Sequence, residues 1–375
     1  MESGRKKLGL IVNPIAGLGG RVGLKGSDGA EIQRRALELG AVPEAPRRAR
    51  EAVERLRPAA GRFDLVTCPA EMGEASAAAC GFAPAVVGSI RPGSTTAEDT
   101  RRAAAEMLRM GVDLLLFAGG DGTARDICDA VGVALPALGI PAGVKIHSAA
   151  FATSPAAAGE LAAACLLGRA TRLREAEVMD LDEEALRAGV LAPRLYGCLR
   201  IPYESSLVQG LKVPSAAGEA ASLSAVAAAV AERMEEDCLY VLGPGTTTRA
   251  VAERLGLRKT LAGVDVVTRR EVLAADAGEA EILRLIRGKR AKIVVTPIGG
   301  QGCIFGRGNQ QISPAVIAAV GRENIIVAAT PEKLQALGGR PLWVDTGDPE
   351  TNRLLAGHVR VVTGHREEAV VRVSG

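Results

Sequence analysis

Residues 112–127, VDLLLFAGGDGTARDI, decide the fold class of this 375-residue chain. The apolar run Val112–Ala118 is typical of a buried strand, and the turn Gly119-Gly120-Asp121-Gly122-Thr123 follows it at once. A second periodic segment predicts a helix that begins near Thr123. A strand, a glycine-rich turn and a helix in this order are typical of an open α/β sheet, which carries its ligand loops at the carboxyl ends of its strands.

The segments around this unit repeat the same alternation. Thr95-Thr96-Ala97-Glu98 has the spacing of a capping box, which predicts a helix that runs through Met110 and ends at Gly111. Short apolar runs also predict strands at Leu8–Val12, Leu65–Cys68, Leu239–Leu242, Val264–Val267, Ile293–Thr296 and Ile325–Ala329. Strands that alternate with helices predict parallel sheets.

The length of the chain predicts two domains, because domains cluster at about 100–200 residues. The composition shifts around the alanine-rich stretch Ser154–Arg172, so we place the boundary near residue 155. Residues 1–155 are expected to form an open-sheet, nucleotide-binding domain. Residues 156–375 are expected to form a second α/β domain that binds substrate and completes an interdomain cleft.

Composition excludes several classes of function. The formal net charge is only +3 and aromatic residues make up 2%, so neither a basic nucleic-acid surface nor a stacking platform is expected. The N-terminal residues show no signal-peptide pattern and no apolar run is long enough to span a membrane. These features predict a cytoplasmic protein with no nucleic-acid or membrane partner.

Cysteine and histidine usage limits the metal chemistry. The seven cysteines are widely spaced and never form a CxxC pair, so they are predicted to be free and mostly buried thiols. Only three histidines are present, which argues against a zinc site. Any metal is therefore expected to be a hard cation held by oxygen atoms.

The GGDGT turn has the chemistry of a phosphate site. Glycines let the backbone approach a ligand closely, and the start of the following helix offers N–H groups and a positive dipole end to an anion. Asp121 would lie in this electropositive turn, where a carboxylate can hold Mg²⁺ or accept a proton from an attacking hydroxyl. The alternative is an aspartate that only caps the helix.

A second glycine-rich loop follows the first predicted strand and includes Asn13, Gly17, Gly19 and Gly20. It fits neither the P-loop pattern nor the dinucleotide fingerprint. We predict a nucleotide-binding loop of another type, and the alternative is a tight connection.

Two further loops carry groups that suit an anion. Lys145 and His147 follow a short apolar run and a glycine, so they could reach a phosphate from a third loop. Gly245 and Thr246 stand between the predicted strand Leu239–Leu242 and a helix, which again predicts an anion site. The alternative for this last loop is that its threonines cap the helix.

The two glycine loops, IVNPIAGLGG and FAGGDGT, resemble those of the ATP–NAD kinase family and its phosphofructokinase-like and lipid-kinase relatives. The resemblance implies that the GGDG loop binds nucleotide phosphates and that Asp121 is a general base linked to the metal. Thr296-Pro297-Ile298-Gly299-Gly300-Gln301 is similar to the family's Thr-Pro-Thr-Gly-Ser loop. Asp182 and Glu183 resemble its Asn-Glu pair that holds NAD.

Longer stretches, including GIPAGVKIHSAAFA and PIGGQGCIFGRGNQQISP, look like a divergent branch of the family that includes acetoin catabolism protein X. The resemblance implies transfer of a phosphoryl group from ATP to the 2′-hydroxyl of the adenosine ribose of NAD, which makes NADP. It also implies Mg²⁺ as cofactor, NAD and ATP as ligands, and a homo-oligomer. Two alternatives stay open, a kinase of another small hydroxylated metabolite linked to acetoin, and a non-catalytic NAD or ATP sensor.

Overall fold

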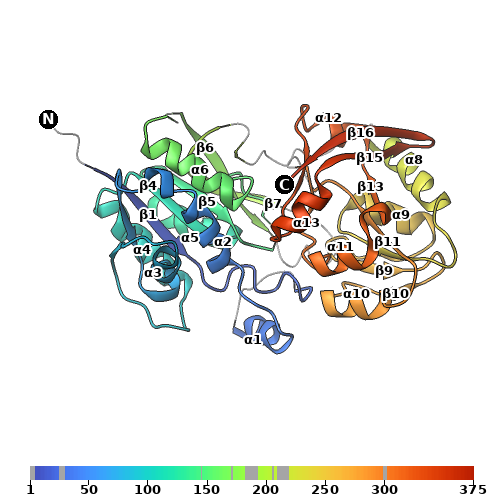
Figure 1. Cartoon of the computed structure of the whole chain (residues 1–375), viewed down its shortest axis with the longest axis horizontal. Helices are drawn as coiled ribbons and strands as arrows, with labels where there is room; N and C mark the ends of the chain where they lie inside the picture. Colours follow the sequence, from blue (N-terminus) through green and yellow to red (C-terminus); the bar gives the residue numbers. More distant parts are fainter. Residues whose placement is uncertain are drawn as a thin grey trace. The chain divides into compact units, whose positions relative to one another are not determined.

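The computed structural model describes residues 5–24, 30–144, 146–169, 172–181, 193–204, 207–208, 219–298 and 302–375. The chain divides into two compact units. The first is formed by Met1–Leu18 and Val42–Gly210, and the second by Gly19–Ala41 and Leu211–Gly375. Both units are α/β, as predicted, and Figure 1 labels most of their elements.

A five-stranded parallel sheet with the order β3-β2-β1-β4-β5 forms the centre of the first unit. Its strands are β1 (Lys6–Val12), β2 (Phe63–Thr67), β3 (Ala85–Val86), β4 (Leu114–Gly119) and β5 (Ala137–Pro141). Every residue of β4 and β5 is buried, because helices cover both faces of a parallel sheet. This explains why these strands read as continuous apolar runs. The carboxyl ends of β1, β4 and β5 lie next to one another.

Helices α2 (Ala45–Glu54) and α6 (Pro155–Leu166) pack together, as do α4 (Ala97–Arg109) and α5 (Asp121–Val131). Three shorter helical segments complete this set: α3 (Glu74–Ala79) and the 3-10 turns at Arg57–Ala59 and Ala70–Met72.

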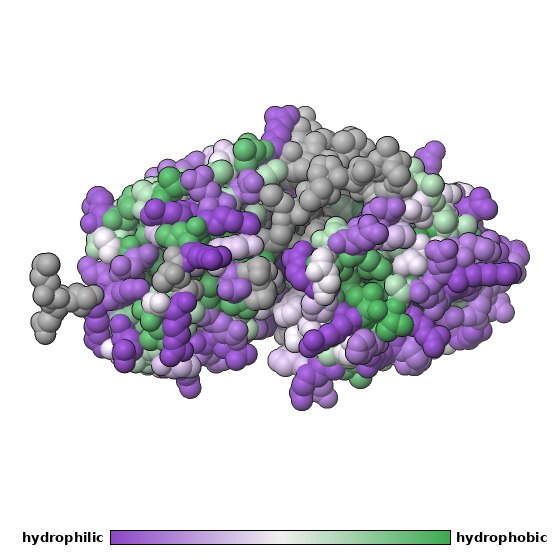
Figure 2. Space-filling view, turned by 90° about the horizontal axis from the view of Figure 1, so that it is seen from above, coloured by the Kyte–Doolittle hydropathy of each residue, from purple (hydrophilic) through white to green (hydrophobic). Residues whose placement is uncertain are grey.

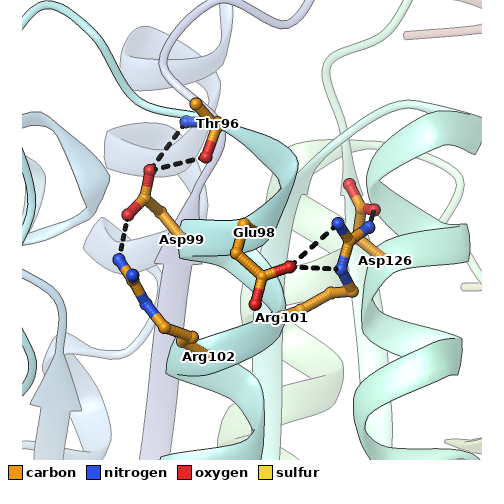
Figure 3. Close-up of polar contacts among 6 residues, drawn as sticks. All are labelled: Thr96, Glu98, Asp99, Arg101, Arg102 and Asp126. Atoms are coloured by element: carbon orange, nitrogen blue, oxygen red, sulfur yellow. Dashed lines mark hydrogen bonds and ion pairs between the residues drawn. The ribbon is translucent and has the colours of Figure 1, made fainter.

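Polar contacts set the start of α4 and join it to α5 (Figure 3). The capping box lies one residue later than predicted, because Asp99 accepts hydrogen bonds from both the backbone nitrogen and the hydroxyl of Thr96. Arg101 binds Glu98 on its own helix and also Asp126 of α5, with 2.6 Å between Arg101 Nη1 and Asp126 Oδ1. The helix that begins at the GGDGT turn is therefore fixed to its neighbour along the sheet.

An antiparallel hairpin, β6 (Leu173–Leu181) and β7 (Pro193–Pro202), belongs to the first unit. Its buried Val178 and Leu199 belong to the same apolar core as the five-stranded sheet. This division differs from the predicted boundary near residue 155, because the hairpin packs on α5, β5 and α6 and so extends the first unit past that residue.

The second unit contains a nine-stranded mixed sheet with the order β10-β9-β8-β11-β13-β15-β16-β14-β12. Its strands are β8 (Leu239–Leu242), β9 (Asp265–Val267), β10 (Val272–Ala274), β11 (Ala291–Val295), β12 (Cys303–Phe305), β13 (Ile325–Ala328), β14 (Leu342–Val344), β15 (Gly357–Gly364) and β16 (Glu367–Ser374). Strands β8, β11, β13 and β15 are parallel, but the β8–β9, β9–β10 and β15–β16 pairs are antiparallel. The prediction of parallel pairing is therefore wrong for these three pairs. Short connections join β9 to β10 and β15 to β16, as is usual for antiparallel neighbours, whereas α9 lies between β8 and β9 in the chain.

The helices of the second unit are α1 (Ala30–Glu38), α8 (Glu219–Glu232), α9 (Thr246–Arg254), α10 (Glu279–Ile286), α11 (Pro314–Val320), α12 (Pro331–Gln335) and α13 (Pro349–Leu355), with a 3-10 turn at Arg322–Asn324. Helices α8 and α9 pack against each other, and α8 also packs on β15. Two buried apolar clusters line the sheet, one around Phe305 and one around Tyr240.

The surface agrees with the composition. Hydrophilic residues form much of the visible surface of each unit in Figure 2, with smaller apolar areas between them. Among the described residues, no helix combines the length and the apolar character that a membrane span requires. All seven cysteines are free, and four of them are buried, which confirms the prediction of unpaired thiols.

Candidate active site

The strand ends of the first unit bring two of the predicted loops together. Asn13, the first residue after β1, donates its backbone N–H to the carbonyl of Ala118 in β4. Its side-chain nitrogen donates to the hydroxyl of Thr123 at 2.9 Å, and its side-chain oxygen accepts from Ile15 N at 3.3 Å. Asn13 therefore fixes the first glycine loop onto the first turn of α5.

Helix α5 begins at Asp121, two residues earlier than predicted, and Gly120 is its N-cap. Asp121, Gly122 and Thr123 therefore form its first turn, where backbone N–H groups have no partner within the helix. Such N–H groups and the positive end of the helix dipole favour an anion. The GGDGT turn therefore forms the start of a helix, and phosphate binding by this turn stays a prediction.

The loops after β4 and β5 approach each other at two glycines. A Cβ atom added to Gly143 would lie only 2.6 Å from the Cα of Gly120, so a side chain there would push the two backbones apart. Gly17 approaches the same region, because it has φ +81° and an added Cβ would lie 2.3 Å from the carbonyl oxygen of Ala142. Three glycine-bearing loops therefore converge at one edge of the sheet.

The carboxylate of Asp121 is bound by the segment that follows β5. Oδ2 accepts from the backbone nitrogen of His147 at 2.8 Å, and the ring atom Nδ1 of His147 lies 3.3 Å from the same oxygen. Oδ1 accepts from Ser148 N at 3.0 Å and from Ser148 Oγ at 2.6 Å. The alternative of a simple helix cap is therefore wrong, because Asp121 reaches across to another loop.

These contacts keep Asp121 ionised. Burial alone would raise the pKa of this carboxyl, but the hydrogen bonds from His147 and Ser148 and the nearby His147 ring outweigh it, so the pKa lies below its usual value. The side chain is 13% exposed. At neutral pH, Asp121 is thus a largely buried anion in a glycine-rich turn.

The residues around Asp121 do not fit a protein-held Mg²⁺ site. Oδ1 accepts two hydrogen bonds from Ser148, and Oδ2 accepts one from the backbone nitrogen of His147, so Asp121 offers a further ligand only one place, on Oδ2, where His147 Nδ1 now lies. Within the part of the chain that the structure describes, no group of three or more His, Cys, Asp or Glu side chains is arranged to hold a metal. A requirement for Mg²⁺ therefore stays a prediction.

The second unit has its own convergence of strand ends. Parallel strands β8, β11 and β13 are neighbours, and each runs into a loop that bears hydroxyl or glycine residues. Gly245, with φ +124°, is the N-cap of α9, and the exposed Thr246 is its first residue. Thr296 directly follows β11 and is only 2% exposed.

The side chains of these three loops contact one another. The hydroxyl of Thr296 lies 3.2 Å from that of the buried Thr247, and Lys333 of α12 donates to Thr247 Oγ1 at 2.8 Å. A longer contact of 3.4 Å joins Lys333 Nζ to the hydroxyl of Thr246. Thr248 donates to the carbonyls of Gly243 and Gly245. The N-cap of α9 is Gly245 and no side chain caps this end of the helix, so the threonines do not act as caps.

Several predicted site residues lie outside these two groups. Lys145, Asp182, Glu183, Gly299, Gly300 and Gln301 fall outside the described residues. Gly19 and Gly20 belong to the second unit, where a Cβ added to Gly20 would lie 2.3 Å from the side-chain oxygen of Gln310. The roles given to these eight residues, like those of the other predicted site residues, stay predictions.

Lys333 and Ser148 take part in these contacts but were not singled out from the sequence. Lys333 follows the predicted strand Ile325–Ala329, and the rule that ligand loops follow strand ends could have found it. Ser148 is adjacent to His147, but its contact with Asp121 joins segments 27 residues apart, and no local pattern indicates it.

The family model described as "ATP-NAD kinase N-terminal domain" matches residues 8–170, and the model described as "ATP-NAD kinase C-terminal domain" matches residues 235–373. No curated protein matches the chain. Two solved structures of a proposed diacylglycerol kinase from Bacillus anthracis str. Sterne are 18% identical to it, with TM-scores of 0.25 and 0.24. Each match covers 45% of this chain and 43% of that one, so this chain spans less than half of their length.

Proposed function

This chain belongs to the ATP-NAD kinase family, and on that premise we propose that it transfers the γ-phosphoryl group of ATP to a hydroxyl group of a small molecule. The observation that carries this proposal is the ionised Asp121 in the first turn of α5. A carboxylate repels a phosphate that binds at the same turn, unless a hydroxyl group or a cation lies between them. An acceptor hydroxyl fits that place, and this favours an enzyme over a protein that only binds nucleotide.

The chain's own residues would act mainly by positioning. Phosphoryl transfer involves a loose transition state and depends on alignment and electrostatic stabilisation. We propose that the first turn of α5 and the loop that contains Asn13 and Gly17 hold the phosphates of ATP. Mg²⁺ would then arrive already bound to ATP. The residues of the first unit would bind those phosphate oxygens that are not bound to the metal.

Asp121 is proposed as the group that receives the acceptor hydroxyl. Of its four contacts, the one with His147 Nδ1 is the longest, at 3.3 Å. A substrate hydroxyl that replaced this contact would donate to Oδ2. Its proton could pass to the carboxylate as the new P–O bond forms and the bond from the γ-phosphorus to the bridging oxygen of ATP breaks, which releases ADP. His147 would thus leave Oδ2 when the acceptor binds, while the backbone hydrogen bonds stay in place.

We propose the 2′-hydroxyl of the adenosine ribose of NAD as the acceptor, with NADP as product. This is the finer part of the proposal, and it is supported by the family that the chain belongs to. The roles of Asp182, Glu183 and the loop Thr296–Gln301 in binding NAD belong to the same proposal. A cytoplasmic location and a homo-oligomer are proposed with it.

A panel of acceptors tests the proposal. The purified chain is incubated with ATP, Mg²⁺ and NAD, NADH or one of a series of small polyols, and both ADP and the phosphorylated product are measured by mass spectrometry. NADP formation supports the full proposal. ATP consumption with another hydroxyl compound alone would show the NAD assignment to be wrong. Saturable ATP binding with no turnover for any acceptor would favour the sensor.

Lys333 supplies a prediction for the second unit. We propose that the loops after β8, β11 and β13 bind a second anionic group of the substrates. Lys333→Met removes the ammonium that donates to Thr246 and Thr247, and a charged hydrogen bond contributes about 1.5–3 kcal/mol. We expect the KM of one nucleotide substrate to rise about 10-fold or more, with kcat changed less.

Lys292→Met is the matched control for Lys333→Met. Lys292 lies near the amino end of β11, whereas Thr296 follows the carboxyl end. Lys292 is paired with Glu235, with 2.5 Å between Nζ and Oε1. Its substitution removes the same charge from the same unit and should leave the KM of both substrates within about twofold. An equal rise of KM in the two variants would point to a general loss of positive charge and would contradict the assigned role of Lys333.

A further inference from the structure

Ser148 lies between Asp121 and the β6–β7 hairpin. It is 0% exposed, although it carries a hydroxyl group. Its Oγ atom is 2.6 Å from Asp121 Oδ1, and it also accepts a hydrogen bond from the backbone nitrogen of Met179 at 2.9 Å. Met179 belongs to β6, so one buried hydroxyl joins the first turn of α5 to a strand of the hairpin.

The backbone fixes the direction of this chain of hydrogen bonds. The N–H group of Met179 can only donate, so Ser148 Oγ must be its acceptor. The single hydroxyl proton of Ser148 is then available for Asp121, whose ionised carboxylate can only accept. The order Met179 N–H to Ser148 O–H to Asp121 is therefore the only one that satisfies all three groups.

The same part of β6 is held to neighbouring elements at two more points. Ala149, the next residue after Ser148, donates its N–H to the carbonyl of Glu177 at 2.8 Å. One turn further along α5 from Asp121, Arg125 forms an ion pair with Asp180 of β6. The register of the β6–β7 pair also shifts between Val178 and Met179, so the ladder is irregular where Met179 meets Ser148. Such irregularities are common next to active sites.

We propose that Ser148 is a positioning residue for the phosphoryl-transfer reaction: it holds Asp121 in one orientation and ties that orientation to β6. This inference rests on the proposed function. Asp121 has two torsion angles, and the paired donors of Ser148 to Oδ1 fix the plane of the carboxylate, so Oδ2 stays directed at the place where His147 Nδ1 now lies. Ser148 itself touches no substrate in this scheme.

Ser148→Ala tests the role by separating kcat from KM. We expect kcat to fall about 10-fold or more, because misplacement of a reacting group by a fraction of an ångström lowers the rate strongly. The KM for ATP should change by less than about twofold, because Ser148 is not among the phosphate-binding residues proposed above. Ser148→Thr keeps the hydroxyl and should recover most of kcat. All variants are assayed well below their melting temperatures.

Ser154→Ala is the matched control. Ser154 is the N-cap of α6 in the same unit, and its hydroxyl oxygen accepts from Ala157 N at 3.1 Å. Its loss removes one hydroxyl hydrogen bond and should lower the melting temperature without lowering kcat. If Ser148→Ala lowers the melting temperature but leaves kcat at the wild-type value, as the control does, Ser148 is only structural and the proposal is wrong.

A second measurement does not depend on activity. Amide hydrogen exchange is compared between the wild type, Asp121→Ala and Asp129→Ala, which changes an aspartate of the same helix. Because Asp121→Ala removes the acceptor of the Ser148 hydroxyl, we expect exchange of the Met179 N–H to become about 10-fold faster in Asp121→Ala alone. Unchanged exchange at Met179 would overturn the proposed chain. Faster exchange in a protein that phosphorylates no acceptor would leave the chain standing while the proposed function fails.

Discussion

Replacing Asp121 with asparagine is expected to lower kcat for phosphoryl transfer by about 10²–10⁴-fold, the usual range for a lost proton-transfer group. An asparagine retains the shape of the side chain but has one oxygen and one NH₂ group. The NH₂ group would face either the backbone N–H of His147 or the two donors of Ser148. In both orientations an N–H donor of the asparagine would point at another donor, and that hydrogen bond would be lost. Both the charge and the orientation of the group are lost.

Asp129→Asn is the control for this prediction. Asp129 lies on the same helix and accepts a hydrogen bond from the hydroxyl of Tyr196 at 2.7 Å, away from the contacts of Asp121. Its asparagine variant retains an oxygen that can accept, and kcat should stay within about twofold of the wild type. The kcat of both variants is measured from steady-state rates of ADP release. Full turnover in Asp121→Asn would remove Asp121 from the chemistry and leave it a purely structural residue.

Gly143→Ala is expected to lower kcat/KM for ATP about 100-fold. The added Cβ would lie 2.6 Å from the Cα of Gly120, a distance at which backbone atoms have to move. Gly120 is the N-cap of α5, so the movement would displace the turn that is proposed to hold the phosphates. A displacement of about 1 Å at a reacting centre can lower the rate about 100-fold, and overpacking costs about 1–3 kcal/mol of stability.

Gly111→Ala separates the loss of stability from the loss of function. Gly111 follows α4 with φ +68°, and an added Cβ would meet nothing within 4 Å. Alanine there is strained by the backbone conformation alone, at a cost of about 1 kcal/mol. Thermal melts should show losses of similar size in the two variants, while isothermal titration with ATP should show weaker binding in Gly143→Ala only. Equal ATP affinity in both would mean that the close approach of the two loops is not needed for nucleotide binding.

The two substitutions examine different properties of the same edge of the sheet. Asp121→Asn leaves the backbone path of the loops unchanged and alters the group that meets the acceptor. Gly143→Ala leaves Asp121 in place and alters the backbone that is proposed to meet the donor. A loss of kcat in the first and of ATP affinity in the second would divide the site into an acceptor side and a phosphate side.

Local patterns were sufficient to predict most elements near the site. Continuous apolar runs predicted β1, β4, β8, β11 and β13 to within two residues at each end, because strands buried on both faces need apolar side chains at every position. Glycines after those strands indicated where the loops lie. The family resemblance was likewise carried by short contiguous motifs, and the family matches confirm it.

Other features depend on contacts between distant segments, and no contiguous pattern contains them. The four contacts of Asp121, the approach of Gly120 to Gly143 and the pairing of Lys333 with Thr247 join residues that lie 23–86 positions apart in the chain. The addition of the β6–β7 hairpin to the first unit has the same origin, because buried Val178 and Leu199 share its core. Amino-acid type and spacing indicate that a carboxylate follows β4. Only packing of the chain decides which donors surround that carboxylate, and those donors set its charge and its orientation.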